Sequence, residues 1–177
     1  MSTRLALANI TYLEQGIELL SAIDDAAYTH AEPPLYTSGV GGHYRHCIDH
    51  YIQLLAGLPE ARVDYDARSR DRSLESRREA AIAKSREIQS QLEALAGSAE
   101  SLPLQTRMDC GDGRRREARW EQSTLGRELQ FMVSHTTHHF ALIALILRHQ
   151  GIEPGADFGV AASTLQHSRR RQPAPAG

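Results

Sequence analysis

The segment between Phe131 and Leu147 constrains the fold most, because it is a helix-length run that is apolar almost all round. A helix without a broad polar face is expected to be central and buried, so other segments must pack around it. Ser123 is predicted to cap its start, and Gly151 follows its predicted end near Gln150.

Three earlier segments have the apolar spacing of amphipathic helices. The first covers residues 3–26. The second begins after Ser38, its predicted N-cap, and runs to about Ala56, where Gly57 ends it. The third covers residues 73–96. Together with the last helix, they predict a four-helix bundle.

Two connections are expected between the later helices. Residues 60–73 are polar and rich in Arg and Asp, which is typical of an irregular connection. Residues 101–121 break the helical pattern and are predicted to form two short strands around the turn Gly111-Asp112-Gly113. The predicted fold is therefore all-α, a four-helix bundle with a long crossover and a small β-hairpin or irregular insert before the last helix.

The chain of 177 residues is long enough for one domain with a sizeable core, which we predict over residues 1–165. Residues 166–177 are basic and then rich in Pro and Ala, so a disordered tail is expected there. Two cysteines make no disulfide framework, and the sequence contains neither a secretion signal nor a long apolar span. These features favour the cytoplasm and no membrane. The net charge of -2 argues against nucleic acid as a partner.

Six of the nine histidines fall in two short clusters, and both clusters lie in predicted helices. His135 and His139 are four residues apart, so they lie one turn apart on one helical face, a spacing at which two imidazoles can bind one metal ion. Burying imidazoles in an apolar helix costs about 1–3 kcal/mol for each unsatisfied group, and a shared cation would remove that cost. His138 is offset from this pair.

His43, His46 and His50 form a second stripe, at the edge of the apolar arc of the second helix. One of them could supply a third ligand. Three protein ligands with an open position are typical of catalytic metal sites, whereas four are typical of structural sites. Helical histidines also occur as hydrogen-bonded core residues. The sequence has no HExxH, ExxH, CxxC, Walker or GxSxG motif, which disfavours the corresponding enzyme classes.

The chain resembles the DinB/YfiT-like family of metal-binding four-helix proteins over almost its whole length, to about residue 165. The resemblance lies in the blocks SGVGGHYRHCIDHYIQLL (38–55), VDYDARSRDRSLE (63–75), STLGRELQFMVSHTTHHFALI (123–143) and FGVAAST (158–164). It implies a metal site made by one histidine of the second helix and the HxxxH pair of the fourth. Carried over to this chain, the ligands are His46, His135 and His139, and His43 and His50 are further candidates.

The resemblance also implies a divalent metal, with zinc ahead of nickel and iron, and a homodimer. Some members of the family are S-transferases that use low-molecular-weight thiols such as bacillithiol or mycothiol. The expected function is therefore that of a metal-dependent enzyme that activates a thiol or a water for a small-molecule substrate. The alternative is a non-catalytic stress-response protein in which the ion is structural. A helical interaction module without metal is a third reading.

Charged and aromatic residues near the histidines are candidates for the pocket or for hydrogen bonds to the ligands. Ordinary surface ion pairs are the alternative for each of the charged ones. Glu128, two turns before His135, is the first choice as a hydrogen-bond partner of a ligand. The full set is Arg45, Asp49, Asp66, Arg68, Arg70, Arg127 and Glu128, with Tyr65 and Trp120 as candidate cleft walls.

Overall fold

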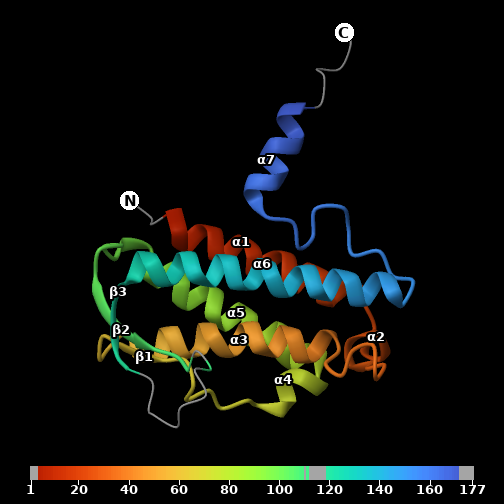
Figure 1. Cartoon of the computed structure of the whole chain (residues 1–177), viewed down its shortest axis with the longest axis horizontal. Helices are drawn as coiled ribbons and strands as arrows, with labels where there is room; N and C mark the ends of the chain where they lie inside the picture. The colour runs from red at the N-terminus through yellow and green to blue at the C-terminus, as the bar shows by residue number, and fades with distance from the viewer. Residues whose placement is uncertain (1–3, 110, 112–118, 172–177) are drawn as a thin grey trace.

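The computed structural model describes residues 4–109, 111 and 119–171. Its four long helices form a bundle (Figure 1), in which α1 and α3 each pack against both α5 and α6. The four are α1 (Arg4–Ala22), α3 (Val40–Gly57), α5 (Arg78–Ala94) and α6 (Leu125–His149). The predicted all-helical bundle with a β insert is confirmed.

Short capped helices interrupt two of the segments that were predicted to be continuous. The Asp24 carboxylate accepts a hydrogen bond from the Ala27 amide (2.8 Å) and starts α2 (Asp25–Thr29). Asp71 likewise caps α4 (Arg72–Ser76), and extended backbone at Arg77 separates α4 from α5. Asp side chains compete for backbone amides in this way at the starts of α2 and α4, whereas Arg77, at the break before α5, makes no side-chain cap. The single turn η1 (Leu95–Gly97) follows α5.

The caps of α3 and α6 differ by one residue from those predicted. Gly39, not Ser38, is the N-cap of α3, and a Cβ atom at Gly39 would lie 2.1 Å from the carbonyl oxygen of His30. The backbones approach too closely there for any other residue. Thr124, not Ser123, caps α6, because its hydroxyl accepts from the Arg127 amide at 3.2 Å. Ser123 instead donates to Glu128.

A three-stranded sheet closes the end of the bundle where α6 begins (Figure 1). The predicted strands are present, and β2 (Pro103–Arg107) pairs antiparallel with β3 (Glu121–Thr124). Of the predicted turn, Asp112 and Gly113 lie outside the described residues. The additional strand β1 (Arg62–Asp64) pairs parallel with β2 inside the expected irregular connection. It is three residues long with one buried side chain, so its pattern is too short to recognise.

A buried polar network joins three of the long helices. The Tyr51 hydroxyl on α3 donates to Asn9 on α1 (2.7 Å) and lies 3.1 Å from the Thr136 hydroxyl on α6. The Asn9 amide donates to the carbonyl oxygens of Leu5 and Leu129. Satisfied buried networks of this kind fix how helices dock, because any shift would leave polar groups unpaired.

Helix α6 was predicted to be packed on all sides, but one of its faces is exposed. Leu145 is 63% exposed and His138 is exposed. Helices α1 and α3 cover two sides of α6, and in the described part of the chain the side that carries Leu145 and His138 is open to solvent. The helix therefore presents apolar and imidazole side chains on the surface as well as in the core.

Helix α7 (Ala162–Arg171) rises from the bundle beyond α6 (Figure 1). It includes part of the segment that the sequence predicted as a tail, and residues 172–177 lie outside the described part of the chain. Among the described helices, none combines the length and the apolar character needed to cross a bilayer.

Candidate metal centre

The two histidine clusters meet where α3 and α6 pack against each other. His43, near the start of α3, contacts His139, whereas His50, further along α3, contacts His135. The two helices therefore run antiparallel. Spacings of three and four residues place each cluster on one helical face, and the packing turns both faces toward one seam.

Three imidazoles in this seam are close enough to share a cation. One ring nitrogen from each of His46, His50 and His135 lies within 4.8 Å of the other two. The Nε2 atoms of His46 and His135 are 3.1 Å apart. The rings of His50 and His135 lie 4.1 Å apart between centroids.

The remaining histidines of the two clusters extend this group along the seam. The ring of His139 lies 4.6 Å from those of both His46 and His135, between centroids. His43 follows, with its Nδ1 atom 3.1 Å from Nδ1 of His139. The structure thus brings together His46, His135 and His139, and also places His50 and His43 beside them. His138 is exposed and contacts His139 from outside, at 5.1 Å between centroids.

The donor set fits a divalent transition metal. Three nitrogens bound to tetrahedral zinc lie about 3.3 Å apart, so a spread within 4.8 Å needs only small side-chain adjustments. Imidazole donors suit zinc, nickel and iron better than magnesium or calcium. The Nδ1 atom of His135 is buried with no hydrogen-bond partner among the described residues, so this ring is incompletely satisfied by the protein alone.

Neighbouring groups set the tautomers of two of these imidazoles. The Nδ1–H group of His50 donates to the carbonyl oxygen of His46 (2.8 Å), which leaves the Nε2 lone pair of His50 available. The Arg68 guanidinium donates to Nδ1 of His46 (2.9 Å), so the proton of this neutral ring lies on Nε2, the atom that faces Nε2 of His135. Arg68, one of the predicted pocket residues, therefore contacts a candidate ligand directly.

Burial keeps the imidazoles neutral. Burial first, and then the charges of neighbouring imidazoles, lower the pKa of His46 to about 3, that of His135 to about 2 and that of His139 to about 4. Burial also lowers the pKa values of His43 and His50. At neutral pH the rings keep lone pairs that a cation can use, because protons do not compete for them.

Glu128 lies near the seam but hydrogen-bonds to groups other than the imidazoles. The Tyr65 hydroxyl donates to Glu128 (2.7 Å), and Ser123 donates to its other oxygen. The Tyr65 ring stacks on His50 at 5.5 Å between centroids. In this structure Glu128 therefore acts on the cluster through Tyr65.

Arg45 and Asp49 pair with each other rather than with an imidazole. Their side chains are 3.1 Å apart, and Arg45 also donates to Glu75. Asp49 is 2% exposed, and this burial raises the pKa of its carboxyl group. Arg45 and Asp49 thus form an ion pair along α3, and Arg45 links this helix to Glu75 of α4.

The other candidate residues lie further from the imidazoles. Asp66 accepts from the Asp109 amide (2.7 Å), while Arg62 and Arg107 stack on Trp120. Arg127 borders a recess beside Tyr65, and Arg70 is on the exposed connection after β1. The sequence analysis missed Phe131, whose ring lies 5.5 Å from His135 between centroids. Its position one turn before His135 could have indicated this contact.

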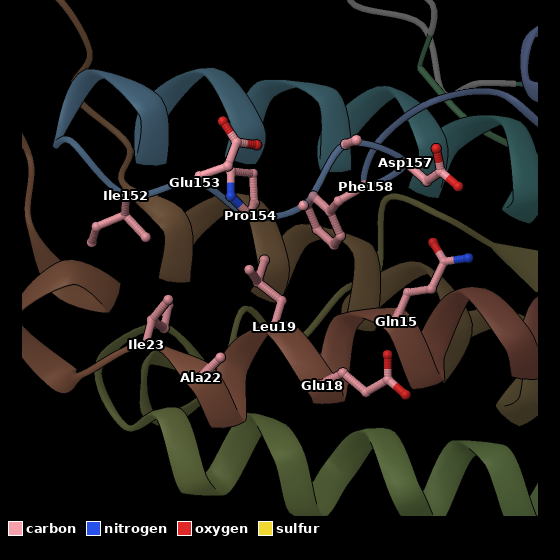
Figure 2. A pocket seen from close by; sticks show the side chains of 12 residues that line it. Gln15, Glu18, Leu19, Ala22, Ile23, Ile152, Glu153, Pro154, Asp157 and Phe158 are labelled. Carbon is pink, nitrogen blue, oxygen red and sulfur yellow. The ribbon is translucent and has the colours of Figure 1, made fainter.

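Two hollows border the histidine seam at its opposite ends. One, of about 250 Å³, is lined by charged residues and by Tyr65 and Phe131. The other, of about 360 Å³, is lined mainly by apolar residues and by His43. A separate cavity of about 590 Å³ lies between α1 and residues 152–158, and no histidine lines it (Figure 2). His43 lines the second hollow, and the first is lined by Tyr65 and Phe131, which contact His50 and His135, so these two adjoin the histidine seam.

Comparison with models of protein families identifies a family for this chain. The family model described as the DinB superfamily matches residues 15–143. FK506-binding protein 5 from Rhizopus delemar is 32% identical over 111 residues. That stretch is 62% of this chain and 28% of the fungal protein, so the chain spans less than a third of this curated relative. No solved structure matches.

Proposed function

Because the chain belongs to the DinB superfamily, we propose that it is a metal-dependent enzyme with a small-molecule substrate. Histidines of α3 and α6 hold one divalent cation, with zinc the first candidate and nickel or iron the alternatives. We further propose that the enzyme works in the cytoplasm, as a homodimer, and is of the thiol S-transferase type.

The observation that carries this proposal is the convergence of three ring nitrogens, from His46, His50 and His135, within 4.8 Å of one another. The residues lie on two antiparallel helices and are far apart in the sequence. Apolar bundle seams rarely hold imidazoles without a compensating partner, because each unsatisfied buried group is costly.

The third ligand is His139 or His50, and each has its own support. The HxxxH spacing and the family resemblance favour His139 with His46 and His135. The distances between nitrogens favour His50, whose Nε2 atom is already the unprotonated one. We retain His46, His135 and His139 as the proposed set, with His50 as the alternative to His139.

A divalent cation at the site would lower the pKa of a thiol or water that reaches it, so that the nucleophile forms near neutral pH. The chain's own residues supply the surroundings. Arg68 adds positive charge beside the site, which favours an anionic sulfur or oxygen. Binding of the cation through Nε2 of His46 would move the ring's proton to Nδ1 and release the hydrogen bond from Arg68. Tyr65 and Phe131 pack their rings against His50.

A structural ion is the second candidate function. It is favoured by the position of His139, whose ring is within 4.6 Å of two of the other candidate ligands. If His46, His50, His135 and His139 all bound the ion, no position would remain for a substrate.

The first experiment measures metal content. Untagged protein should purify with about one divalent ion per chain, and His46→Ala or His135→Ala should remove it. His50→Ala and His139→Ala are compared in parallel, since the larger loss identifies the third ligand. His138→Ala is the control and should retain the metal, because His138 points outward. Full metal content in both His46→Ala and His135→Ala would refute the site.

The second experiment separates the enzyme from the structural ion. Protein loaded with cobalt is titrated with ethanethiol, and a thiolate-to-cobalt absorption band is expected if a coordination position is open. An unchanged spectrum at saturating thiol would contradict the thiol mechanism and favour the structural role.

A further inference from the structure

The apolar hollow at one end of the histidine seam forms a groove along the open face of α6. Its wall consists of Leu142, Leu145 and Ile146 from α6 and of Leu35 from the loop before α3. Its volume of about 360 Å³ is within the range of small-molecule sites. The groove is thus large enough for an alkyl chain or an aromatic ring.

The groove is continuous with the proposed metal centre. His43 lines it, and the same imidazole lies 3.1 Å from His139 through their Nδ1 atoms. His139 in turn contacts His46 and His135. A molecule lying in the groove would therefore have one end at the row of imidazoles.

The groove also exposes apolar surface that none of the residues described by the structure covers. Leu35 and Leu145 are each 63% exposed. At the end away from the cluster, His149 bonds to Glu32 (3.0 Å) and packs edge-on against Tyr36. The apolar stretch is thus bounded by polar groups at both ends, which limits the length of what it can hold.

The hollow at the other end of the seam has the opposite character. Arg119, Glu121 and Arg127 line it, together with Glu128. A substrate with one apolar part and one polar part would therefore meet different surroundings on the two sides of the metal centre, and this difference would fix its orientation.

We propose that the groove lined by Leu35, Leu142 and Leu145 binds an apolar alkyl or aryl group of the substrate, and so selects amphiphilic substrates whose polar end meets the histidines. This inference rests on the function proposed above. It adds the substrate class: a small molecule with an alkyl or aryl group next to its reacting polar end.

The groove itself is tested without metal, using the neutral dye N-phenyl-1-naphthylamine. Metal-free wild-type protein should bind the dye with a rise in fluorescence, and Leu145→Asp should weaken binding at least tenfold. Leu7→Asp is the matched control, because Leu7 is 50% exposed on α1, away from the groove, and it should bind as wild type does. Circular dichroism confirms that both variants fold. Equal dye binding by the two variants, or none by the wild type, would overturn the inference.

The link to the metal centre is tested with cobalt-loaded protein and alkanethiols of two, four and six carbons. Each methylene buried in the groove should tighten binding about fourfold, read from the absorption band of the bound thiolate. Leu145→Asp should flatten this dependence and Leu7→Asp should keep it. Equal affinities for all three thiols in the wild type would show that the groove does not serve the site.

The dye experiment and the alkanethiol experiment together distinguish the failure of this inference from the failure of the proposed function. If ethanethiol gives no band, the thiol mechanism fails, and the dye still decides whether the groove binds apolar groups. A second copy of the chain is the other occupant to exclude by analytical ultracentrifugation. A dimer that Leu145→Asp dissociates, with dye binding that appears only on dilution, would assign the groove to self-association and refute the inference.

Discussion

At His135, burial and crowding act in the same direction on the imidazole. The ring is packed among His46, His50 and Phe131, so a proton on it would be poorly solvated and close to other rings that can become charged. The sequence predicted that this residue and His139 share a helical face. It could not predict which α3 histidine they meet, because that depends on how far the antiparallel helices are displaced along each other.

The lowered pKa values predict a pH-dependent stability for the metal-free protein. The folded pKa of His135 is about 2, against about 6.5 in the unfolded chain. Between these values the unfolded state binds more protons, so the free energy of unfolding decreases as the pH falls below about 6.5 and levels off above about pH 7. Urea denaturation in EDTA should show this fall between pH 7 and pH 5.

His135→Gln tests the origin of that fall. Glutamine does not titrate, so the variant should lose less stability between pH 7 and pH 5 than the wild type. His167→Gln, at an exposed position on α7, is the control and should follow the wild-type curve. The same fall in all three proteins would show that these imidazoles do not cause it.

The long helices follow from their apolar periodicity, but that periodicity does not predict where they are interrupted. The predicted segments 3–26 and 73–96 were right in type, but the first breaks at the Asp24 cap and the second breaks at Arg77, whose backbone is extended and whose side chain makes no cap. The break at Arg77 carries no capping signal, so apolar spacing alone could not reveal it. The strand β1 was missed because its pairing partner lies 43 residues away.

Helix α1 packs closely against two aromatic side chains of the bundle at Gly16. A Cβ atom at Gly16 would lie 2.7 Å from the Tyr44 hydroxyl and 2.9 Å from the Phe140 ring, and both aromatic side chains are 1% exposed. We therefore expect Gly16→Ala to destabilise the protein by about 1–3 kcal/mol through overpacking, despite the better helix propensity of alanine.

Chemical denaturation monitored by circular dichroism measures this effect. Gly97→Ala serves as the control, because a Cβ atom there meets nothing within 4 Å, and its change should stay within about 0.5 kcal/mol. A Gly16→Ala variant as stable as the wild type would mean that the helices can separate at this point without cost.

For the whole molecule, the proposed metal centre joins segments that the sequence separates widely. His46 and His135 are 89 residues apart, so the donors come together only when the bundle has formed. The sequence indicated the two histidine clusters. The family resemblance indicated that the two clusters lie together in the folded protein. The choice between His50 and His139 depends on the packed arrangement and remains for experiment.

A cation that binds only the folded bundle should raise its melting temperature. At zinc a hundredfold above Kd, the expected gain is about 2.7 kcal/mol, or about 5–10 °C in Tm for a chain of this size. Differential scanning fluorimetry of EDTA-treated protein measures it. Magnesium should have no effect, because it prefers oxygen ligands. A rise of the same size in His46→Ala would contradict binding at this site.

Tyr65 connects the sheet to the metal centre. It follows β1 directly, and its amide donates to the Arg107 carbonyl on β2 (3.0 Å), while its ring covers His50 and its hydroxyl holds Glu128. Successive side chains of a strand point to opposite faces. If β1 slipped by one residue along β2, the tyrosine would swing away, uncover the imidazole and leave a buried carboxylate without its donor. A misalignment of this three-residue strand would thus expose one side of the proposed metal centre to water.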